Sequence, residues 1–346
     1  MDILHNTRPA ALTGLDDVPF PSVDADAPMA LLKRCPAAGQ TPLVSAKPIA
    51  AQADVAEVWI KDERGRMGLG SFKALGAAYV IAHDAEQGNA KGATYVTASA
   101  GNHGMSVAAG AAAFGARAVV YIAQTVPDAF AARLADQGAE VVRAGETYEA
   151  SMEAAAQAAS DNGWRLLSDS SWEGYMEYPH RVMEGYLALM AEAIEQMEQV
   201  PSHIFLQAGV GGLAGSCATL ARQVWGDVPR IIVVEPAFAA ALYGSVAAGG
   251  PTEGGGPVSN MGRLDCKMPS LIALKGLARD ADDFVLLSEA EAEAGAGAMM
   301  VAGWPSTESG AAGVAALLAA SADQRRELDL TKDARVLCIL SEGPEG

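Results

Sequence analysis

The stretch that decides the fold is ATYVTASAGNHGMSVAAGAAAF, residues 93–114. It begins with an apolar segment typical of a strand, Ala93–Ala98, and continues through a polar loop, Ser99–Gly104. A helix of small residues then extends to about Phe114. A strand that leads directly into a helix is typical of parallel sheets, because parallel strands need a crossover to connect them.

The same alternation continues on both sides of this stretch. Strands are expected at 55–60, 117–123, 139–143, 164–167, 203–207, 231–235 and 336–340. Helices are expected from about residue 71, at 128–137, 148–159 and 289–300, and within 173–199. Strands separated by helices of this length predict a doubly wound α/β fold.

Composition restricts the possible partners. The chain has 346 residues, of which 50% are hydrophobic, and 24 Lys and Arg against 42 Asp and Glu give 24 − 42 = −18. Such a charge argues against nucleic acid and anionic membranes as partners, since both bind through basic surface. Met1–Arg8 lacks the order of a signal peptide, and no uninterrupted apolar stretch reaches the roughly 18–20 residues of a membrane span. We therefore expect a cytoplasmic protein.

The cysteines do not indicate a metal site. They are scattered, with no CxxC pair and no histidine cluster nearby: Cys35, Cys217, Cys266 and Cys338. This pattern argues against a zinc site and against a disulfide framework. We expect ordinary thiols and no bound metal.

Three polar loops directly follow predicted strands. They are Ser99–Gly104, Gly209–Gly212 and Ser341–Gly343, and a fourth polar element, Ser71–Lys73, begins a helix. Ligands of open parallel sheets bind outside the carboxyl ends of the strands. If the four elements converge, they supply a lysine, hydroxyl and amide groups, and a glycine loop, which together suit a coenzyme.

Lys73 is the candidate nucleophile. Its neighbours in SFKALGAAYV are apolar, and partial desolvation would lower the pKa of the amine and favour the neutral form that a Schiff base needs. The alternative is a lysine whose ammonium group reaches solvent.

The other loops offer groups for an anion. In QAGVGGL, residues 207–213, backbone N–H groups at the start of a helix can approach a phosphate. The spacing matches neither a dinucleotide fingerprint nor an ATP-binding P-loop, and a simple tight turn is the alternative. In SAGNHG, residues 99–104, hydroxyl and amide groups suit a carboxylate together with a phenolic oxygen.

The motifs SFK, SAGNHG, GVGGL and SEG, in this order, resemble those of fold-type II pyridoxal-phosphate enzymes. This group includes serine/threonine dehydratases, serine racemases, cysteine synthases and threonine synthases. Within this group, the chain resembles the diaminopropionate ammonia-lyase branch. The segments that carry this resemblance are KDERGRMGLGSFKALG, DSSWEGY, VVEP and ESGAAG. The similarity covers about Lys61 to Gly343.

The resemblance implies two domains of the tryptophan synthase β-like architecture, pyridoxal 5'-phosphate as the coenzyme, and a homodimer. We expect an N-terminal arm over 1–45, a large domain over 46–90 and 165–346, and a smaller domain inserted at 91–164.

The resemblance also implies residue roles. Lys73 would hold the coenzyme and act as the base at Cα, Asn102 would bond its ring oxygen, and Ser341 would face its pyridine nitrogen. The phosphate would lie on Gly209, Val210, Gly211, Gly212 and Leu213. The substrate carboxylate would be bound by Ser99, Gly101 and Asn102.

The chain also departs from the branch. Ammonia-lyases of this branch carry an aspartate at the position of Ala100, and the resemblance implies that this aspartate is the second base for D-substrates. Asp169 is present and could act on the leaving amino group. In NMGRLDCKMPS, residues 260–270, Arg263 and Lys267 would suit an acidic substrate such as 3-hydroxyaspartate. The alternative is that both cations are solvated or pair with acids.

The expected reaction is α,β-elimination of a β-substituted amino acid to a 2-oxo acid and ammonia, first of all 2,3-diaminopropionate to pyruvate and two ammonia. The alternatives are a dehydratase of serine, threonine or 3-hydroxyaspartate, a β-replacement synthase, and a non-catalytic coenzyme-binding protein.

Overall fold

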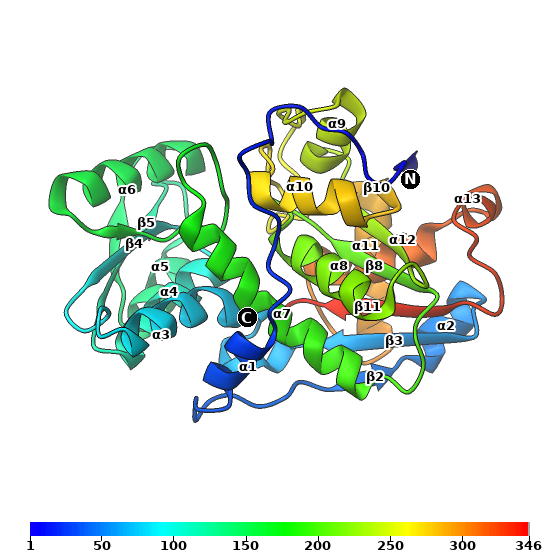
Figure 1. The fold of residues 1–346 in the computed structure, drawn as a ribbon, viewed down its shortest axis with the longest axis horizontal. Helices are drawn as coiled ribbons and strands as arrows, with labels where there is room; N and C mark the ends of the chain where they lie inside the picture. The colour runs from blue at the N-terminus through cyan, green and yellow to red at the C-terminus, as the bar shows by residue number, and fades with distance from the viewer. Residues whose placement is uncertain (345–346) are drawn as a thin grey trace.

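The computed structural model describes residues 1–344, whose strands form two separate sheets (Figure 1). The larger sheet has the order β1-β10-β9-β8-β11-β3-β2, and the smaller one β6-β5-β4-β7. The strands are β1 Asp2–His5, β2 Leu43–Ser45, β3 Glu57–Asp62, β4 Thr94–Ala98, β5 Arg117–Ile122, β6 Glu140–Arg143, β7 Arg165–Leu166, β8 His203–Gln207, β9 Arg230–Pro236, β10 Asp283–Leu287 and β11 Arg335–Leu340.

Helices fill the crossovers between these strands. They are α1 Asp26–Leu32, α2 Lys47–Ala53, α3 Gly76–Glu86, α4 Asn102–Ala113, α5 Asp128–Asp136, α6 Tyr148–Asn162, α7 Glu177–Gln196, α8 Gly212–Trp225, α9 Ala241–Ala248, α10 Leu271–Asp280, α11 Glu289–Val301, α12 Glu308–Ala319 and α13 Ala322–Glu327. Two 3₁₀ turns, η1 Glu63–Gly68 and η2 Phe72–Leu75, connect β3 to α3. The helices of residues 1–344 are each too short or too polar to span a bilayer.

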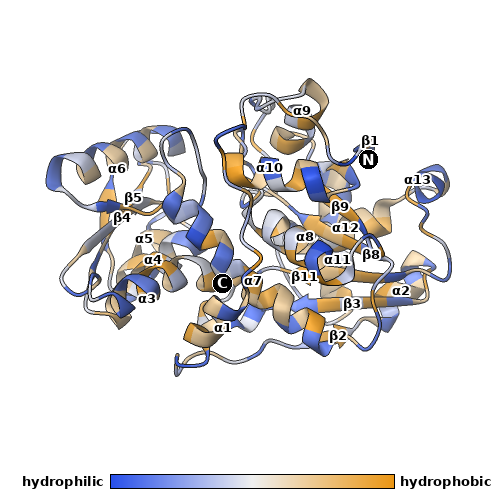
Figure 2. Cartoon of the chain, viewed as in Figure 1, coloured by the Kyte–Doolittle hydropathy of each residue, from blue (hydrophilic) through white to orange (hydrophobic). Residues whose placement is uncertain are grey.

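The larger sheet is buried on both faces. Along β8, Ile204 and Leu206 pack into the core beneath α7, α8 and α10, whereas Phe205 between them packs into the core beneath α2, α11 and α12. Successive side chains of a strand point to opposite faces, so a strand covered on both sides is apolar throughout. Figure 2 shows hydrophilic and hydrophobic positions mixed along α7 and α10, whereas α8 and α12 are buried over most of their length.

The strand order places the predicted loops together. β8, β11 and β3 are neighbours and parallel, so their carboxyl ends lie on one edge of the larger sheet. The glycine loop follows β8, Ser341 follows β11, and the segment with Lys73 follows β3 through η1. β4, in the interior of the smaller sheet, ends at Ala98 and leads into Ser99–Gly104.

Several elements were not predicted from the sequence. Within the first 45 residues, β1 pairs antiparallel with β10 and β2 pairs antiparallel with β3, so this segment supplies both edge strands of the larger sheet. The helix expected from Ser71 begins as the 3₁₀ turn η2, and its α-helical part starts only at Gly76. The Ser71 side chain accepts the Lys73 N–H (3.1 Å) and so caps that turn.

Candidate active site

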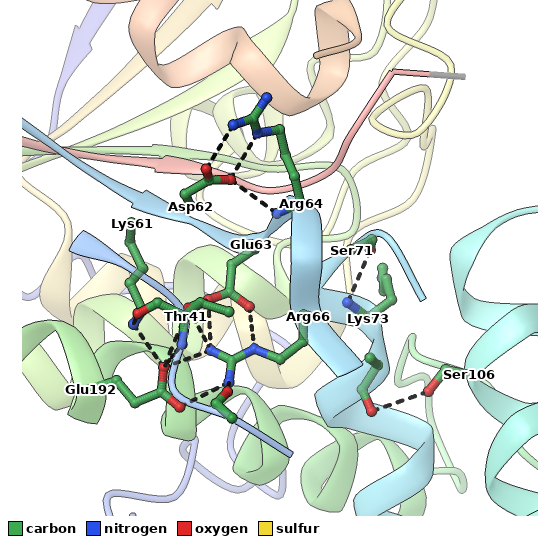
Figure 3. A network of polar contacts seen from close by, with 12 residues as sticks. Thr41, Lys61, Asp62, Glu63, Arg64, Arg66, Ser71, Lys73, Ser106 and Glu192 are labelled. Atoms are coloured by element: carbon green, nitrogen blue, oxygen red, sulfur yellow. Dashed lines mark hydrogen bonds and ion pairs between the residues drawn. The ribbon is translucent and has the colours of Figure 1, made fainter. Parts of the chain in front are cut away.

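The four polar elements meet between the two sheets. The Phe72 N–H donates to the Ser341 carbonyl (3.0 Å), and Ser71 forms an isolated bridge with Glu342. These contacts fix the Lys73 turn against the end of β11. The backbone of Lys73 is thereby held at the carboxyl edge of the larger sheet (Figure 3).

The Lys73 ammonium group faces a carboxylate from the other sheet. Its Nζ donates to Oδ2 of Asp169, which lies just after β7, and about a fifth of each side chain is exposed (21% and 19%). Two aromatic rings flank the amine, with Nζ 5.3 Å from the ring centroid of Phe72 and 5.6 Å from that of Tyr186. The candidate nucleophile therefore lies in a partly apolar pocket beside one acid.

The protonation of Lys73 differs from the sequence-based expectation. Burial alone would lower the pKa of its amine, as expected, but the Asp169 carboxylate overcomes burial and raises the pKa above the ordinary value. The Asp169 pKa is lowered, because the attraction of Lys73 exceeds the effect of burial, which would raise it. Without coenzyme, the two groups are an ion pair. The expectation of a neutral amine was wrong because the sequence did not show that Asp169 would lie beside Lys73.

The glycine loop has the geometry of an anion cradle. Gly211, which caps the N-terminus of α8, has φ of +99°, a conformation that favours glycine. A Cβ on Gly209 would lie 3.0 Å from Sγ of Cys266 and 3.2 Å from the Arg263 carbonyl. Gly209 therefore packs too closely against residues 263–266 to carry a side chain, and the N–H groups of the loop lie at the start of a helix, where a phosphate can bind.

Tyr186 connects this loop to the lysine. A Cβ on Gly212 would lie 3.5 Å from the Tyr186 ring, and the same ring flanks Lys73. The Tyr186 hydroxyl is buried and has no hydrogen-bond partner among the described residues, and burial raises its pKa to about 12. A buried hydroxyl without a partner usually marks the place of a ligand or water. The lysine, the cradle and this hydroxyl fit a phosphorylated aldehyde coenzyme.

The loop Ser99–Gly104 closes the site from the smaller sheet. The Gly101 N–H donates to Ser99 Oγ (3.3 Å), and a Cβ on Gly104 would lie 2.2 Å from the Ser99 carbonyl, so only glycine allows this tight turn. Nδ2 of Asn102, the first residue of α4, donates to Oε2 of Glu342. Asn102 therefore reaches the end of β11 from the opposite side of the site.

His103, the next residue, has a structural contact. Its Nε2 lies 2.9 Å from the Leu167 carbonyl, which joins α4 to the segment after β7 that contains Asp169. Burial lowers the pKa of its imidazole, which favours the neutral form.

Arg263 lies over the same loop. A Cβ on Gly101 would lie 3.3 Å from Arg263 Nε, and the guanidinium carbon is 5.9 Å from the ring centroid of Phe130 in α5. A small depression beside the loop is lined by Ala100, Gly101, Asn102, Met105, Phe130, Arg133 and Arg263. On its other side, Arg263 lines a cavity of about 280 Å³ next to Ser306–Ser309 and Glu342. Arg133, an exposed residue of α5, lines the same depression, so two arginines lie near the loop that contains Ala100.

Lys267, the other predicted cation, is not placed with Arg263. Its Nζ donates to the carbonyls of Phe238 (2.7 Å) and Pro257 (3.0 Å) and to the carboxylate of Asp265. It lines neither the cavity nor the depression. These contacts stabilise a loop, so the expectation that Lys267 binds substrate is not supported by its surroundings.

Three residues of the site were missed from the sequence: Tyr186, Arg133 and Glu342. The signal for Glu342 was available, because it directly follows Ser341 in SEG, after a buried strand. Tyr186 and Arg133 lie inside helices, where nothing in the sequence distinguishes them from ordinary helical residues. Among residues 1–344, no group of three or more His, Cys, Asp or Glu side chains is placed to hold a metal ion.

Comparison with known proteins agrees with this geometry. A family model described as "Pyridoxal-phosphate dependent enzyme" matches residues 35–342. This chain belongs to the family of pyridoxal-phosphate-dependent enzymes. The match includes three of the four polar elements of the site in full, and Ser341 and Glu342 of the fourth.

Within this family, the chain is similar to enzymes that act on amino acids. Diaminopropionate ammonia-lyase of Escherichia coli K12 is 34% identical over 337 residues, which cover 88% of this chain and 84% of the relative. Human L-serine dehydratase/L-threonine deaminase is 32% identical over 182 residues, about half of each chain (52%). The crystal structure of the E. coli ammonia-lyase with an aminoacrylate–PLP azomethine intermediate superposes with a TM-score of 0.88 at 30% identity, over 99% of this chain and 93% of that one. The fold is that of the fold-type II enzymes.

Proposed function

We propose that the chain catalyses α,β-elimination from a β-substituted amino acid, with pyridoxal 5'-phosphate as coenzyme, to give a 2-oxo acid and ammonia. The observation that supports this most strongly is the pair of Lys73 and Asp169, which lies beside the glycine cradle and Asn102. Elimination needs a base at Cα and a proton donor at the leaving group, and Lys73 with Asp169 beside it could pass one proton from the first to the second.

The bound coenzyme supplies an aldehyde that takes up the amino group and a ring that withdraws electrons from Cα. Gly209, Val210, Gly211, Gly212 and Leu213 would hold its phosphate through their N–H groups. Asn102 would donate to the ring oxygen. Ser341, a neutral residue at the end of β11, would face the pyridine nitrogen.

Lys73 would remove the Cα proton with its Nζ once the amine is free. Asp169, whose carboxylate lies against that Nζ, would take up the proton and deliver it to the leaving group. Ser99, Gly101 and Asn102 would bind the substrate carboxylate, which fixes the orientation of the Cα–H bond.

For the substrate, we propose 2,3-diaminopropionate first. The ammonia-lyase of E. coli is similar over most of this chain, and Asp169 suits a protonated β-amino group. The products would be pyruvate and two ammonia. Because Ala100 has no acidic group, we expect action on the L-form and not on the D-form.

A second candidate, a dehydratase of 3-hydroxyaspartate, is favoured by a different observation. Arg133 and Arg263 both border the depression next to Ala100, and guanidinium groups bind carboxylates well. A substrate with a second carboxylate would find two cations there.

One panel of substrates tests both candidates. The coenzyme-loaded enzyme is assayed for oxo acid and ammonia with each enantiomer of diaminopropionate, with L-serine, with L-threonine and with the 3-hydroxyaspartates. Two ammonia per pyruvate from L-diaminopropionate supports the first candidate. Oxaloacetate from a hydroxyaspartate, with diaminopropionate inert, supports the second. Turnover of none of them, with coenzyme bound, contradicts both.

The remaining expectations concern organisation. We propose the domain division given above, 1–45, 46–90 with 165–346, and 91–164. The presence of two sheets supports its general form, but β7, Arg165–Leu166, pairs with β4 and belongs to the smaller sheet. From the family resemblance we also propose a homodimer, and we propose a cytoplasmic location. Sedimentation equilibrium and cell fractionation test these two points.

A further inference from the structure

The roles proposed above leave one carboxylate of the site unused. Glu342 lies two residues after the end of β11, is 5% exposed, and accepts hydrogen bonds on both oxygens. Oε1 accepts from the hydroxyl of Thr307, the N-cap of α12, and Oε2 accepts from Nδ2 of Asn102. Arg263 Nε lies 3.8 Å from Oε2. The carboxylate is thus surrounded by donors.

The bond to Asn102 decides which way its amide points. An asparagine side chain has an oxygen and an NH₂ group of similar shape, and its orientation follows from its partners. A carboxylate only accepts, so it binds the NH₂ group and turns the oxygen away. The NH₂ group has two N–H bonds, and one of them remains for another acceptor.

The two partners come from different sheets. Asn102 begins the helix after β4 of the smaller sheet, whereas Glu342 and Thr307 belong to the side of the larger sheet. The Glu342 side chain is itself wedged in place, since a Cβ on Gly310 would lie 2.9 Å from its Cγ. The amide of Asn102 is therefore set by a group with little freedom to move.

We propose that Glu342 is a positioning residue that fixes the Asn102 amide so that its second N–H donates to the ring oxygen of the coenzyme. This inference rests on the proposed role of Asn102. Glu342 need not touch the coenzyme. Its effect passes through Asn102, and it is the same whichever amino acid is the substrate.

A purely structural role for Glu342 has different consequences. Its backbone is held independently of the side chain, because Ser306 Oγ donates to the Glu342 carbonyl (2.6 Å) and Ser71 bridges to the same residue. Replacing the side chain should therefore leave the end of β11 in place. A fall in coenzyme affinity without a fall in melting temperature is then attributable to the lost orientation.

The first test is coenzyme binding to the coenzyme-free chain, followed by quenching of tryptophan fluorescence. Glu342→Ala should raise the Kd for pyridoxal 5'-phosphate about tenfold, the size expected for one charge-assisted hydrogen bond. Glu342→Gln keeps the volume and should also weaken binding, because its amide has one oxygen for two donors. The control is Glu308→Gln, which removes an acid from the same cavity and should leave the Kd unchanged.

A double-mutant cycle gives the sharper test. If Glu342 acts through Asn102, the variant with both Asn102→Ala and Glu342→Ala should bind no more weakly than Asn102→Ala alone. Additive losses, or an unchanged Kd in both Glu342 variants, would overturn the inference. Failure of the unmutated chain to bind the coenzyme would instead contradict the proposed function.

Discussion

Lys61 and Lys73 both pair with a carboxylate inside the protein, but only one of them is closed off from solvent. Lys61 has a fully buried side chain, and its Nζ donates to Glu192 (2.7 Å) and to the Thr41 carbonyl (2.7 Å). Lys73 is partly exposed and has Asp169 as its acid. The two lysines lie on either side of the same turn (Figure 3).

The two sites also differ in how completely their groups are paired. Around Lys61, two cations and two anions form one closed cluster, in which Arg66 binds both Glu63 (2.7 Å) and Glu192 (2.7 Å). Burial lowers the Lys61 pKa in spite of Glu192, whereas Asp169 raises the Lys73 pKa in spite of burial. The charged groups of the Lys61 cluster are buried and paired with one another, whereas the Lys73–Asp169 pair is partly exposed and lies beside Tyr186, which contacts the glycine loop. A buried lysine therefore indicates a structural role when its partners surround it, and a catalytic role when one side of it remains accessible.

The largest expected effect is the loss of turnover when Lys73 is replaced. Lys73→Ala should reduce turnover by at least about 10⁴-fold, because both the attachment of the coenzyme and the base at Cα are lost. The visible absorbance band of the bound coenzyme should disappear. Lys332→Ala removes the same charge at an exposed position (80%) and should change neither. An unchanged spectrum in Lys73→Ala would give the role to another lysine.

Breaking the closed cluster should affect stability rather than chemistry. Glu192→Ala leaves Lys61 and Arg66 with one acid between them, and we expect a loss of about 3–5 kcal/mol in the free energy of unfolding. Urea unfolding of the coenzyme-free chain measures this. A loss below about 1 kcal/mol would mean that the cluster does not stabilise the fold.

Removing the acid of the open pair should slow the reaction. Asp169→Asn should lower kcat about 10²–10³-fold, because the proton can no longer be passed to the leaving group. Burial of Lys73 then loses its main opposing group, so the pKa of its amine should fall from its raised value. The pH dependence of amine acylation in the coenzyme-free chain measures that pKa. A pKa that stays raised would show that Asp169 is not its cause.

The smallest expected effect is a change in KM when Arg263, at the edge of the open site, is replaced. Arg263→Ala should raise KM about tenfold for a hydroxyaspartate and change KM for L-serine much less, because only the former has a second carboxylate. Lys267→Ala is the control, because the Lys267 ammonium group donates to backbone carbonyls. This variant should change KM for both substrates to the same extent. Equal changes for both substrates in Arg263→Ala would remove the support for an acidic substrate.

Much of the fold was predictable from the sequence because the central strands are apolar throughout and lead directly into polar loops. β4, β5 and β8 agree with the prediction to within a residue at each end. The edge strands β1 and β2 were not predicted, since they are short, lie in a proline-rich segment, and become strands only by pairing with β10 and β3. Their conformation depends on tertiary contacts that no local pattern contains.

The site was predictable where its residues lie in loops that follow strands, and not where they lie in helices. Lys73, Asn102 and the glycine loop stood out because small and polar residues follow apolar strands. Tyr186 looks like any other residue of α7 until the fold brings its ring between Lys73 and Gly212. The raised pKa of Lys73 was also not predictable, because Asp169 is distant from Lys73 in sequence and is brought beside it only by the pairing of β7.

The most direct test of the central claim is to find which lysine holds the coenzyme. The loaded protein is reduced with borohydride, which makes a lysine–coenzyme linkage permanent, and is then digested and mapped by mass spectrometry. We expect one modified peptide, containing Lys73, and an unmodified Lys61. A modification at any other lysine, or none in a protein that releases oxo acid from the substrate panel, would contradict the account.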